Sequence, residues 1–267
     1  MFVIDPRVRN QIEPVVRRVL VVDPNMAAAK LLGDLMKGLG AREVVFEQDE
    51  KQAYEICRDL EPGMVLTERT GPRLDGEQLA RRIRRSTLAC RRAPIIMVTS
   101  DATATTIKGA RDAGVHEFLR KPYTAGDLQR RVEVVALKPR NWVEALGYIG
   151  PDRRRFNSGE FKGEAKRQAD KPVSQSEAQG EATDMALRIL RSAHAKFDTD
   201  PMQALRAMRE QALALKTIAV NTGEARIAVA VAGLEVALMN TQATQASLAG
   251  PVTKVLSLFP EPVAKVG

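Results

Sequence analysis

Four strand-length segments in the first half of the chain each lead into a polar residue. They are Val19–Val22 before Asp23, Met64–Thr67 before Glu68, Ile95–Val98 before Thr99, and Phe118–Arg120 before Lys121. Short, mostly apolar segments of this kind are typical of the buried strands of a parallel sheet. In open sheets, ligand sites lie at the edge formed by the carboxyl ends of the strands. The spacing therefore predicts that the four polar side chains share one crevice.

The intervening segments have helical patterns, which gives a regular alternation of strands and helices. The predicted strands are 18–22, 42–46, 64–68, 94–100 and 116–120, and the predicted helices are 25–39, 49–60, 76–89, 103–113 and 124–137. Asn25 and Thr124 are capping residues, and Gly40 ends the first of these helices. The alternation predicts an α/β domain, a doubly wound five-stranded parallel sheet with helices on both faces.

The four motifs, in this order and spacing, resemble the receiver domain of bacterial response regulators, and in particular the chemotaxis-regulator type. The resemblance covers residues 16–138 and implies a flavodoxin-like fold. In that family an acid pair and a phosphoacceptor aspartate hold Mg2+, a hydroxyl residue binds the phosphoryl group, and a lysine neutralises it. The resemblance assigns Asp23 to the acid pair, Glu68 to the phosphoacceptor, Thr99 to the hydroxyl and Lys121 to the lysine. It also assigns Phe118 to the aromatic switch position.

Two residues depart from the family pattern. Pro24 occupies the second acid position, which removes a metal ligand, and Glu68 is one methylene longer than aspartate. Mg2+ requires near-octahedral oxygen coordination at short distances, so both changes weaken the site. We therefore expect weak or absent Mg2+ binding, no other cofactor, and no useful phosphorylation of Glu68.

Glu68 has two interpretations that the sequence leaves open. Its longer side chain reaches towards the position of a phosphoryl oxygen, where it could pair with Lys121, accept a bond from Thr99 and imitate the charge of phosphorylation. Alternatively, the switch has been lost and Glu68 only forms a structural salt bridge with Lys121. Both interpretations are consistent with a glutamate at position 68, so the sequence does not distinguish them.

The composition changes after Pro139 and divides the chain into further parts. We predict an N-terminal arm or short helix at 1–15, the receiver-like domain at 16–138, a basic and polar linker at 139–181, a helical bundle at 182–260 and a tail at 261–267. Charged residues, glycine, serine and glutamine dominate the linker from 150 to 180, as in flexible segments.

The linker begins with a short arginine-rich motif, Gly147–Arg155. It resembles the tail of some alphaproteobacterial receivers, in which Gly-Pro-Asp and consecutive arginines follow the last helix. Arg153, Arg154 and Arg155 could bind phosphate groups, since guanidinium forks suit that geometry, and arginine-rich receiver-like proteins known to bind cyclic di-GMP are similar in layout. The competing interpretation is an ordinary solvated basic surface, with which the modest net charge of +8 is consistent.

The last third of the chain predicts an all-helical bundle. The expected helices are 182–196, 201–220, 224–240 and 243–259, with Pro251 bending or interrupting the last. Short connections between four amphipathic helices are typical of an up-down bundle. The segment Leu213–Thr217 weakly resembles the phosphorylated helix of histidine phosphotransfer domains, with Leu213 in place of the histidine. We therefore interpret Leu213 and Lys216 as part of a docking surface.

Composition sets limits on the remaining function classes. A chain of 267 residues with 44% apolar content can form two domains with separate cores. No segment has the length of a membrane span, and the first residues lack the order of a secretion signal. Cys57 and Cys90 have no metal-ligand spacing, so we interpret them as reduced thiols of a cytoplasmic protein. No phosphate-binding loop, metal-binding histidine cluster or nucleophile elbow indicates catalysis.

Together these features predict a non-enzymatic, phosphorylation-independent receiver that acts as an adaptor in two-component signalling. The expected partners are a histidine kinase, a phosphotransfer protein, another receiver or a motility component, and a homodimer is a further option. The alternative is an effector that responds to cyclic di-GMP or nucleic acid through Arg153–Arg155.

Overall fold

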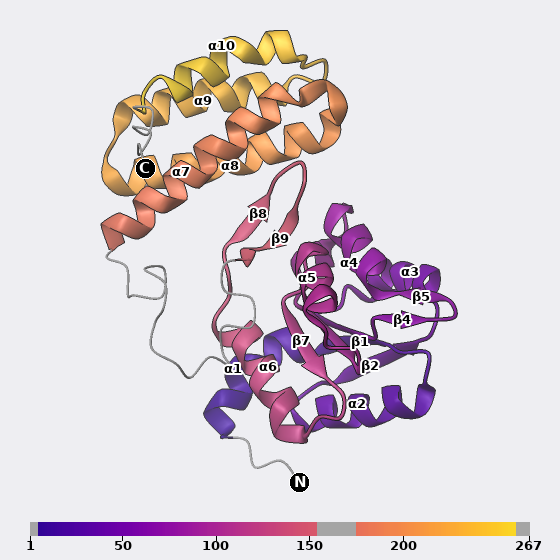
Figure 1. Cartoon of the computed structure of the whole chain (residues 1–267). Helices are drawn as coiled ribbons and strands as arrows, with labels where there is room; N and C mark the ends of the chain where they lie inside the picture. The colour runs from indigo at the N-terminus through magenta and orange to yellow at the C-terminus, as the bar shows by residue number, and fades with distance from the viewer. Residues whose placement is uncertain (1–4, 154–174, 260–267) are drawn as a thin grey trace. The chain divides into compact units, whose positions relative to one another are not determined.

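The structure, a computed structural model, describes residues 5–153 and 175–259 and contains two compact units (Figure 1). Of the described residues, unit 1 contains 5–143 and 148–153, and unit 2 contains 144–147 and 175–259. Each unit has its own apolar core. Within the described ranges, no helix is both long enough and apolar enough to cross a membrane.

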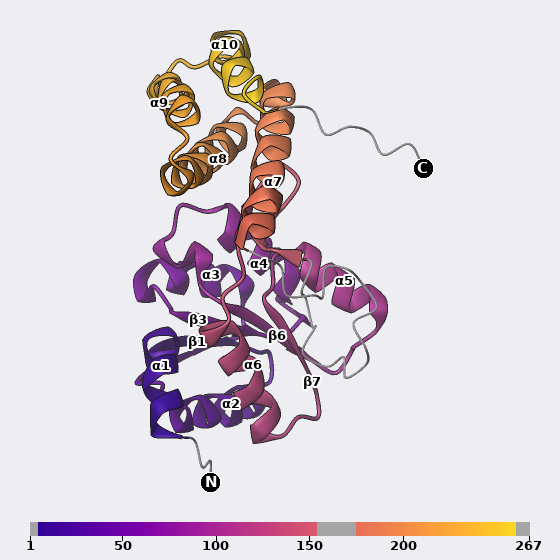
Figure 2. The same ribbon diagram turned by 90° about the vertical axis from the view of Figure 1, so that its left-hand side faces the viewer.

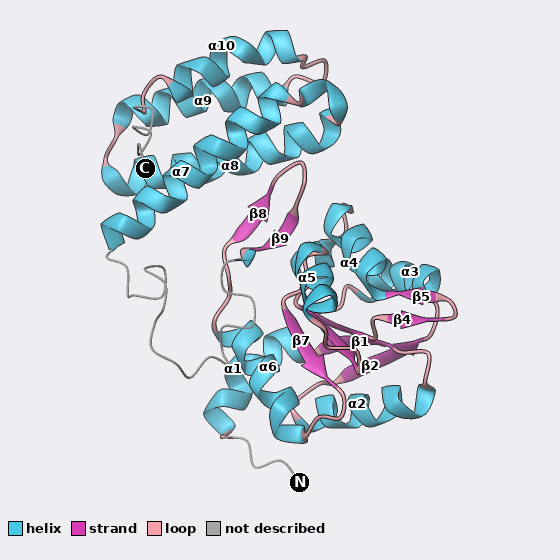
Figure 3. Ribbon diagram, viewed as in Figure 1, coloured by secondary structure: helices cyan, strands magenta, loops and turns pink. Residues whose placement is uncertain are grey.

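Unit 1 is built on a parallel sheet of five strands (Figure 3). The strands are β1 (Arg18–Val22), β2 (Glu43–Glu47), β3 (Met64–Thr67), β6 (Ile95–Thr99) and β7 (Glu117–Arg120). Their order across the sheet is β2-β1-β3-β6-β7, and each neighbouring pair is parallel. The predicted doubly wound, flavodoxin-like fold is therefore confirmed. The carboxyl ends of β1, β3, β6 and β7 lie at one edge of this sheet.

Helices cover both faces of the sheet because the buried strands carry apolar residues on both sides. One face packs against α1 (Pro6–Val16), α2 (Met26–Gly38) and α6 (Ala125–Leu137), and the other packs against α3 (Glu50–Leu60), α4 (Gly76–Arg85) and α5 (Ala104–Asp112). The segment expected to be an arm or short helix is thus a helix that contacts α6, as both views show (Figures 1 and 2). Its residues Ile12 and Val16 are fully buried.

Two segments of unit 1 differ from the sequence prediction. The predicted helix 76–89 ends at Arg85 because the Ser86 hydroxyl donates to the carbonyl of Ile83 at 2.7 Å, and a short 3-10 helix, η1 (Ala89–Arg92), follows. After Glu68 the chain forms a small hairpin of β4 (Thr70–Gly71) and β5 (Leu74–Asp75). Both differences are turns of a few residues, which the spacing of apolar residues along the sequence does not predict.

The first part of the predicted linker is folded. It contains the hairpin of β8 (Trp142–Glu144) and β9 (Ile149–Pro151). Tyr148 and Ile149 are buried. Gly150 permits this packing because a Cβ atom there would lie 2.8 Å from the Cα of Gly114. The sequence places Gly150 in the predicted linker, whereas in the structure its lack of a side chain allows two backbone segments to meet.

Unit 2 is a four-helix bundle, as predicted. It contains α7 (Gln175–Ala195), the 3-10 helix η5 (Phe197–Thr199), α8 (Pro201–Thr222), α9 (Ala225–Met239) and α10 (Gln245–Leu256). Each helix contacts the next, and α10 contacts α7, which closes the bundle. The first helix begins at Gln175 rather than at 182, and the last continues through Pro251 without interruption.

Unit 2 also includes Glu144–Gly147, which the sequence assigns to the linker. Glu144 is buried, and its carboxylate accepts a hydrogen bond from Gln203 Nε2 at 3.1 Å. Its backbone carbonyl accepts another from Gln211 Nε2 at 3.3 Å, while Leu146 packs against the bundle core. Two buried glutamines of α8 thus satisfy a carboxylate and a carbonyl that would be costly to bury alone.

Candidate functional site

The carboxyl edge of the sheet, where the crevice is predicted, brings together three of the predicted residues. Asp23 follows β1, Glu68 follows β3 and Lys121 follows β7. Lys121 Nζ donates to Asp23 Oδ2 at 2.8 Å and to Glu68 Oε2 at 2.7 Å. The side chains of Asp23, Glu68 and Lys121 are 5%, 12% and 25% exposed, respectively. The ammonium group therefore bridges two largely buried carboxylates.

This arrangement affects the titration of Lys121. Burial on its own lowers the pKa of an ammonium group, but the hydrogen bonds from Lys121 to Asp23 and Glu68 outweigh it and raise the pKa above its usual value. Lys121 is therefore charged at neutral pH. Lys121 thus forms two charge-assisted hydrogen bonds, one with each carboxylate. Bonds of this kind are stronger than hydrogen bonds between neutral groups.

Each carboxylate also accepts one backbone hydrogen bond, which fixes its orientation. Asp23 Oδ1 accepts from the amide of Asn25 at 2.8 Å, and Glu68 Oε1 accepts from the amide of Arg69 at 2.7 Å. Asn25 is also the N-cap of α2, so the turn that places Asp23 is the turn that begins this helix. Both oxygens of each carboxylate are thus engaged by the protein itself.

Thr99 lies at the end of β6 and is buried. Its hydroxyl accepts a hydrogen bond from the amide of Asp101 at 3.4 Å. Among the bonds of the described residues, those of the Glu68 carboxylate go to Arg69 and Lys121, and none joins it to Thr99. The anticipated bond between Thr99 and Glu68 is therefore not part of this structure, whereas the ion pair between Glu68 and Lys121 is.

Arg69 is a residue of this site that the sequence did not single out. Its guanidinium contacts Glu77 Oε1 at 3.4 Å and Asp101 Oδ2 at 3.0 Å. Asp101 also accepts from the Thr106 hydroxyl at 2.9 Å, and this bond, with Arg69 as a further contributor, lowers the pKa of Asp101. Arg69 therefore ties the loop after β3 to the loop that follows Thr99. No motif in the sequence marks a pair separated by about thirty residues.

The donor set at this crevice does not fit Mg2+. Pro24 brings no carboxylate, and its carbonyl accepts from Gln48 Nε2 at 2.7 Å. The two carboxylates that remain both direct an oxygen to Lys121, whose positive charge opposes a cation. In the described residues, no cluster of three histidine, cysteine, aspartate or glutamate side chains is arranged to hold a metal.

Phe118, at the predicted switch position, is buried within the core that packs against α3, α4 and α5. It pairs in register with Met97, two residues before Thr99. The side chain at this position thus lies inward.

The arginine-rich motif is only partly described. Arg153 lies 4.4 Å from the centre of the Tyr148 ring, and its guanidinium pairs with Asp112 Oδ1 at 3.0 Å. The Tyr148 hydroxyl donates to the carbonyl of Pro151 at 2.6 Å. Arg153 is therefore held by its own domain. Arg154 and Arg155 lie outside the described residues, so anion binding by the three arginines stays a prediction.

A buried arginine beneath the β8–β9 hairpin was not predicted either. Arg84 is 1% exposed and donates to the carbonyls of Gly114, Arg91 and Ala93 and to His116 Nδ1 at 3.0 Å. Burial lowers the pKa of Arg84 to about 9, and burial followed by the charge of Arg84 lowers the pKa of His116 well below its usual value. The hydrogen bond from Arg84 requires an unprotonated Nδ1, so the neutral imidazole carries its proton on Nε2.

Arginines also gather around the single tryptophan of the chain. The guanidinium groups of Arg84, Arg91 and Arg92 lie 5.4 to 5.6 Å from the centre of the Trp142 ring. Cations at this distance interact favourably with an indole face. These three arginines, on α4 and η1, therefore share an aromatic partner from a distant part of the sequence.

The predicted docking residues of unit 2 lie on α8. Leu213 is 57% exposed. Lys216 Nζ pairs with Glu235 Oε2 of α9 at 2.8 Å. The structure thus places both at the surface, and their role in docking stays a prediction.

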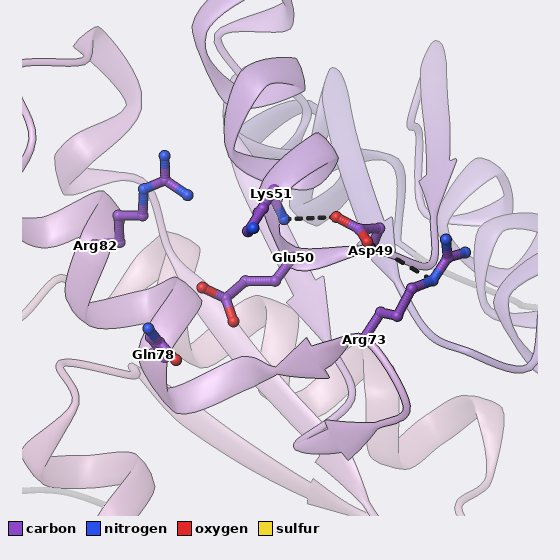
Figure 4. A pocket seen from close by; sticks show the side chains of 6 residues that line it. All are labelled: Asp49, Glu50, Lys51, Arg73, Gln78 and Arg82. Atoms are coloured by element: carbon purple, nitrogen blue, oxygen red, sulfur yellow. Dashed lines mark hydrogen bonds and ion pairs between the residues drawn. The ribbon is translucent and has the colours of Figure 1, made fainter.

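A pocket of about 560 Å3 lies apart from the crevice, at the start of α3 (Figure 4). It is lined by Asp49, Glu50, Lys51, Arg73, Gln78 and Arg82. Arg73 pairs with Asp49 at 3.7 Å, and Arg82 stacks on the Tyr54 ring at 3.8 Å. Charges of both signs line this pocket, and none of the predicted site residues belongs to it.

Comparison with known proteins assigns the first domain. Residues 19–133 match the response regulator receiver domain. The gliding motility regulatory protein of Myxococcus xanthus is 38% identical over 104 residues, which are 39% of this chain and 13% of that protein. The chemotaxis protein CheY1 of Helicobacter pylori is 26% identical over 119 residues, which are 44% of this chain and 95% of that protein.

A solved structure is similar over a comparable share of this chain. The chemotaxis response regulator CheY4 of Vibrio cholerae is 18% identical, with a TM-score of 0.42, over 45% of this chain and 98% of that one. The family match is thus to the receiver part of the chain, and the chain spans only about an eighth of the Myxococcus protein.

Proposed function

Because residues 19–133 form a response regulator receiver domain, we propose that this protein signals without phosphorylation, as a non-enzymatic adaptor that binds other signalling proteins. The observation that carries the proposal is Lys121 Nζ, which is bound at once by Asp23 and by Glu68. In the family, the lysine neutralises a phosphoryl group. Here a carboxylate of the protein already supplies that negative charge.

The surroundings of the ion pair support the same proposal. Pro24 at the second acid position leaves the crevice without the third carboxylate that Mg2+ coordination uses. Phosphoryl transfer depends on that ion to neutralise the charge of the incoming group. Phe118 lies inward, the orientation expected if Glu68 imitates phosphorylation. Glu68 would then hold the switch in one state.

Partner binding is assigned to the face formed by α5, β7 and α6, which phosphorylation remodels in related receivers. Candidate partners are a histidine kinase, a phosphotransfer protein, another receiver or a motility component of the cytoplasm. The exposed Leu213 and Lys216 of α8 give unit 2 a second candidate docking surface. On this proposal they bind a receiver without transferring phosphate, since Leu213 cannot be phosphorylated.

The first experiment tests phosphorylation directly. The intact protein is incubated with Mg2+ and acetyl phosphate, and its mass is compared with that of a Pro24→Asp/Glu68→Asp variant. We expect no phosphoryl adduct on the wild-type protein and an adduct on the variant, in which all three acids are restored. Incorporation of phosphate at Glu68 in the wild-type protein would contradict the proposal.

The second experiment tests the role of the carboxylate. Affinity capture with crosslinking compares the wild-type protein with Glu68→Ala, and Asp34→Ala serves as the control because Asp34 is an exposed acid of α2. If Glu68 imitates phosphate, partner recovery falls in Glu68→Ala and is unchanged in Asp34→Ala. Equal recovery from all three proteins would show that Glu68 only closes a salt bridge.

A further inference from the structure

The only two cysteines of the chain lie together in the core of unit 1, although 33 positions separate them. Cys57 is on α3 and Cys90 is on η1. The sulfur of Cys90 lies 3.4 Å from the carbonyl oxygen of Cys57. Cys57 is 0% and Cys90 5% exposed, and both belong to one apolar cluster. The fold therefore brings every thiol of the protein to one place.

The two thiols are not equivalent. A hydrogen bond between them, followed by burial, raises the pKa of Cys57 well above its usual value. The same bond lowers the pKa of Cys90, and the positive charge of Arg84 acts in the same direction, while Glu61 opposes it. Thiolates are the reactive form of cysteine, and arginine neighbours favour them. The Cys90 thiol, which donates to the Cys57 carbonyl, is the one whose thiolate its surroundings favour, so we assign Cys90 as the nucleophile of the pair.

Cys90 also lies on a short segment near the surface of unit 1. The 3-10 helix η1 has four residues, and Leu88 at its N-cap provides no side-chain hydrogen bond. Its residues Ala89 and Arg92 are exposed. Arg84 donates to the carbonyls of Arg91 and Ala93, which fixes the end of this segment in place. Cys90, at 5% exposed against 0% for Cys57, is thus the thiol of the pair that lies nearer the solvent.

We propose that Cys57 and Cys90 are a redox-modification site that forms a reversible intramolecular disulfide with a peroxide as oxidant. The Cys90 thiolate attacks one oxygen of hydrogen peroxide, the O–O bond breaks, and the released hydroxide takes a proton to give water. Cys90 is then a sulfenic acid. The Cys57 sulfur attacks it, the S–O bond breaks, and the thiol proton leaves with the hydroxyl group as a second water. Two thiols and one peroxide thus yield one disulfide and two waters.

The disulfide would join α3 to the segment that leads into β6. It would close a loop of about 34 residues and lower the conformational entropy of the unfolded chain. Unit 1 should consequently unfold at a higher urea concentration when oxidised. This inference does not depend on the signalling role proposed above, because neither thiol belongs to the crevice of Lys121.

The test is oxidation of the intact folded protein with hydrogen peroxide, followed by mass spectrometry without reductant. The expected product has lost two hydrogen atoms, has no titratable thiol, contains a linked pair of peptides with Cys57 and Cys90, and returns to two thiols with dithiothreitol. Retention of both thiols while methionines gain oxygen would overturn the proposal, as would disulfides only between separate chains.

Two single variants test the order of the steps. In Cys57→Ser, Cys90 should still react, so a sulfenic acid at Cys90 should be trapped by dimedone. In Cys90→Ser, Cys57 should not react in the folded protein and should react only in urea. Trapping at Cys57 but not at Cys90 in the folded variants would refute the assignment of the nucleophile. Far-ultraviolet circular dichroism establishes that each variant is folded before oxidation.

Discussion

Replacement of Lys121 by methionine is the most direct test of the crevice. The substitution keeps most of the apolar side chain and removes the ammonium group that Asp23 and Glu68 share. Two carboxylates that are 5% and 12% exposed then face each other without a cation. Uncompensated buried charge is among the few causes of large losses in stability from a single substitution.

The expected loss follows from the burial of the three side chains. Removal of one partner from a fully buried ion pair costs about 3–5 kcal/mol. Because Lys121 is 25% exposed, water can partly replace it, and we expect a loss of about 2–3 kcal/mol at pH 7. A second substitution, Glu68→Gln, removes the repulsion between the carboxylates, so the double variant should recover about half of that loss.

Unfolding in urea, followed by tryptophan fluorescence, measures this loss in the correct domain. The chain has one tryptophan, Trp142, and it belongs to unit 1. Lys108→Met is the matched control because Lys108 is an exposed lysine of α5. A loss below about 0.5 kcal/mol in Lys121→Met, the range of ordinary surface substitutions, would refute the argument.

The pH dependence gives an independent check. The Lys121→Met variant should lose the part of the pH dependence of stability that comes from Lys121. In the wild-type protein the raised pKa of Lys121 makes the stability depend on pH in the alkaline range. Its contribution is fully present below the unfolded pKa of about 10.4 and is lost as the pH rises through the folded value.

Three further substitutions test the packing of unit 1. His116 has a lowered pKa, so the unfolded chain binds a proton first and stability should fall as the pH drops below about 6.5; His116→Gln should flatten this slope in acid urea titrations. In Gly63→Ala the new Cβ would lie 2.4 Å from a backbone oxygen, so the free energy of unfolding should fall by at least about 2 kcal/mol. Gly126→Ala is the control, because its Cβ would have contacts of 3.7 Å or more and the substitution should be neutral or stabilising. Arg153→Ala loses the pair with Asp112 and should cost about 0.5–1 kcal/mol, with the deficit reduced in high salt.

The sequence predicts the sheet and the meeting of three polar residues because both follow from local patterns. Buried strands have an apolar signature, and parallel strands bring their carboxyl ends to one edge whatever the helices between them contain. Asp23, Glu68 and Lys121 could therefore be placed together without knowledge of any side-chain contact. The direction of the Thr99 hydroxyl could not be predicted, because it depends on the loop that Arg69 and Asp101 hold together.

The arrangement around the β8–β9 hairpin could not be predicted from the sequence for a different reason. The residues that hold it come from distant segments, and each is ordinary in its own context. From the sequence, Arg84 is one of several basic residues on an amphipathic helix, and Gly150 is a glycine of the predicted linker. Only the folded chain shows that Arg84 bonds three backbone carbonyls and that Gly150 meets Gly114. Linear composition therefore placed the end of the domain before the hairpin.

The charges of the crevice explain why its two departures from the family pattern belong together. Two carboxylates and one ammonium group leave a single negative charge, whereas an acid pair, a phosphoacceptor and a lysine leave two, which a divalent cation can balance. With Pro24 in place, an added phosphoryl group would find no such cation, and with Glu68 its anionic position is already filled. Restoring only one residue should therefore fail: Pro24→Asp alone should improve Mg2+ binding without phosphorylation, and Glu68→Asp alone should gain neither.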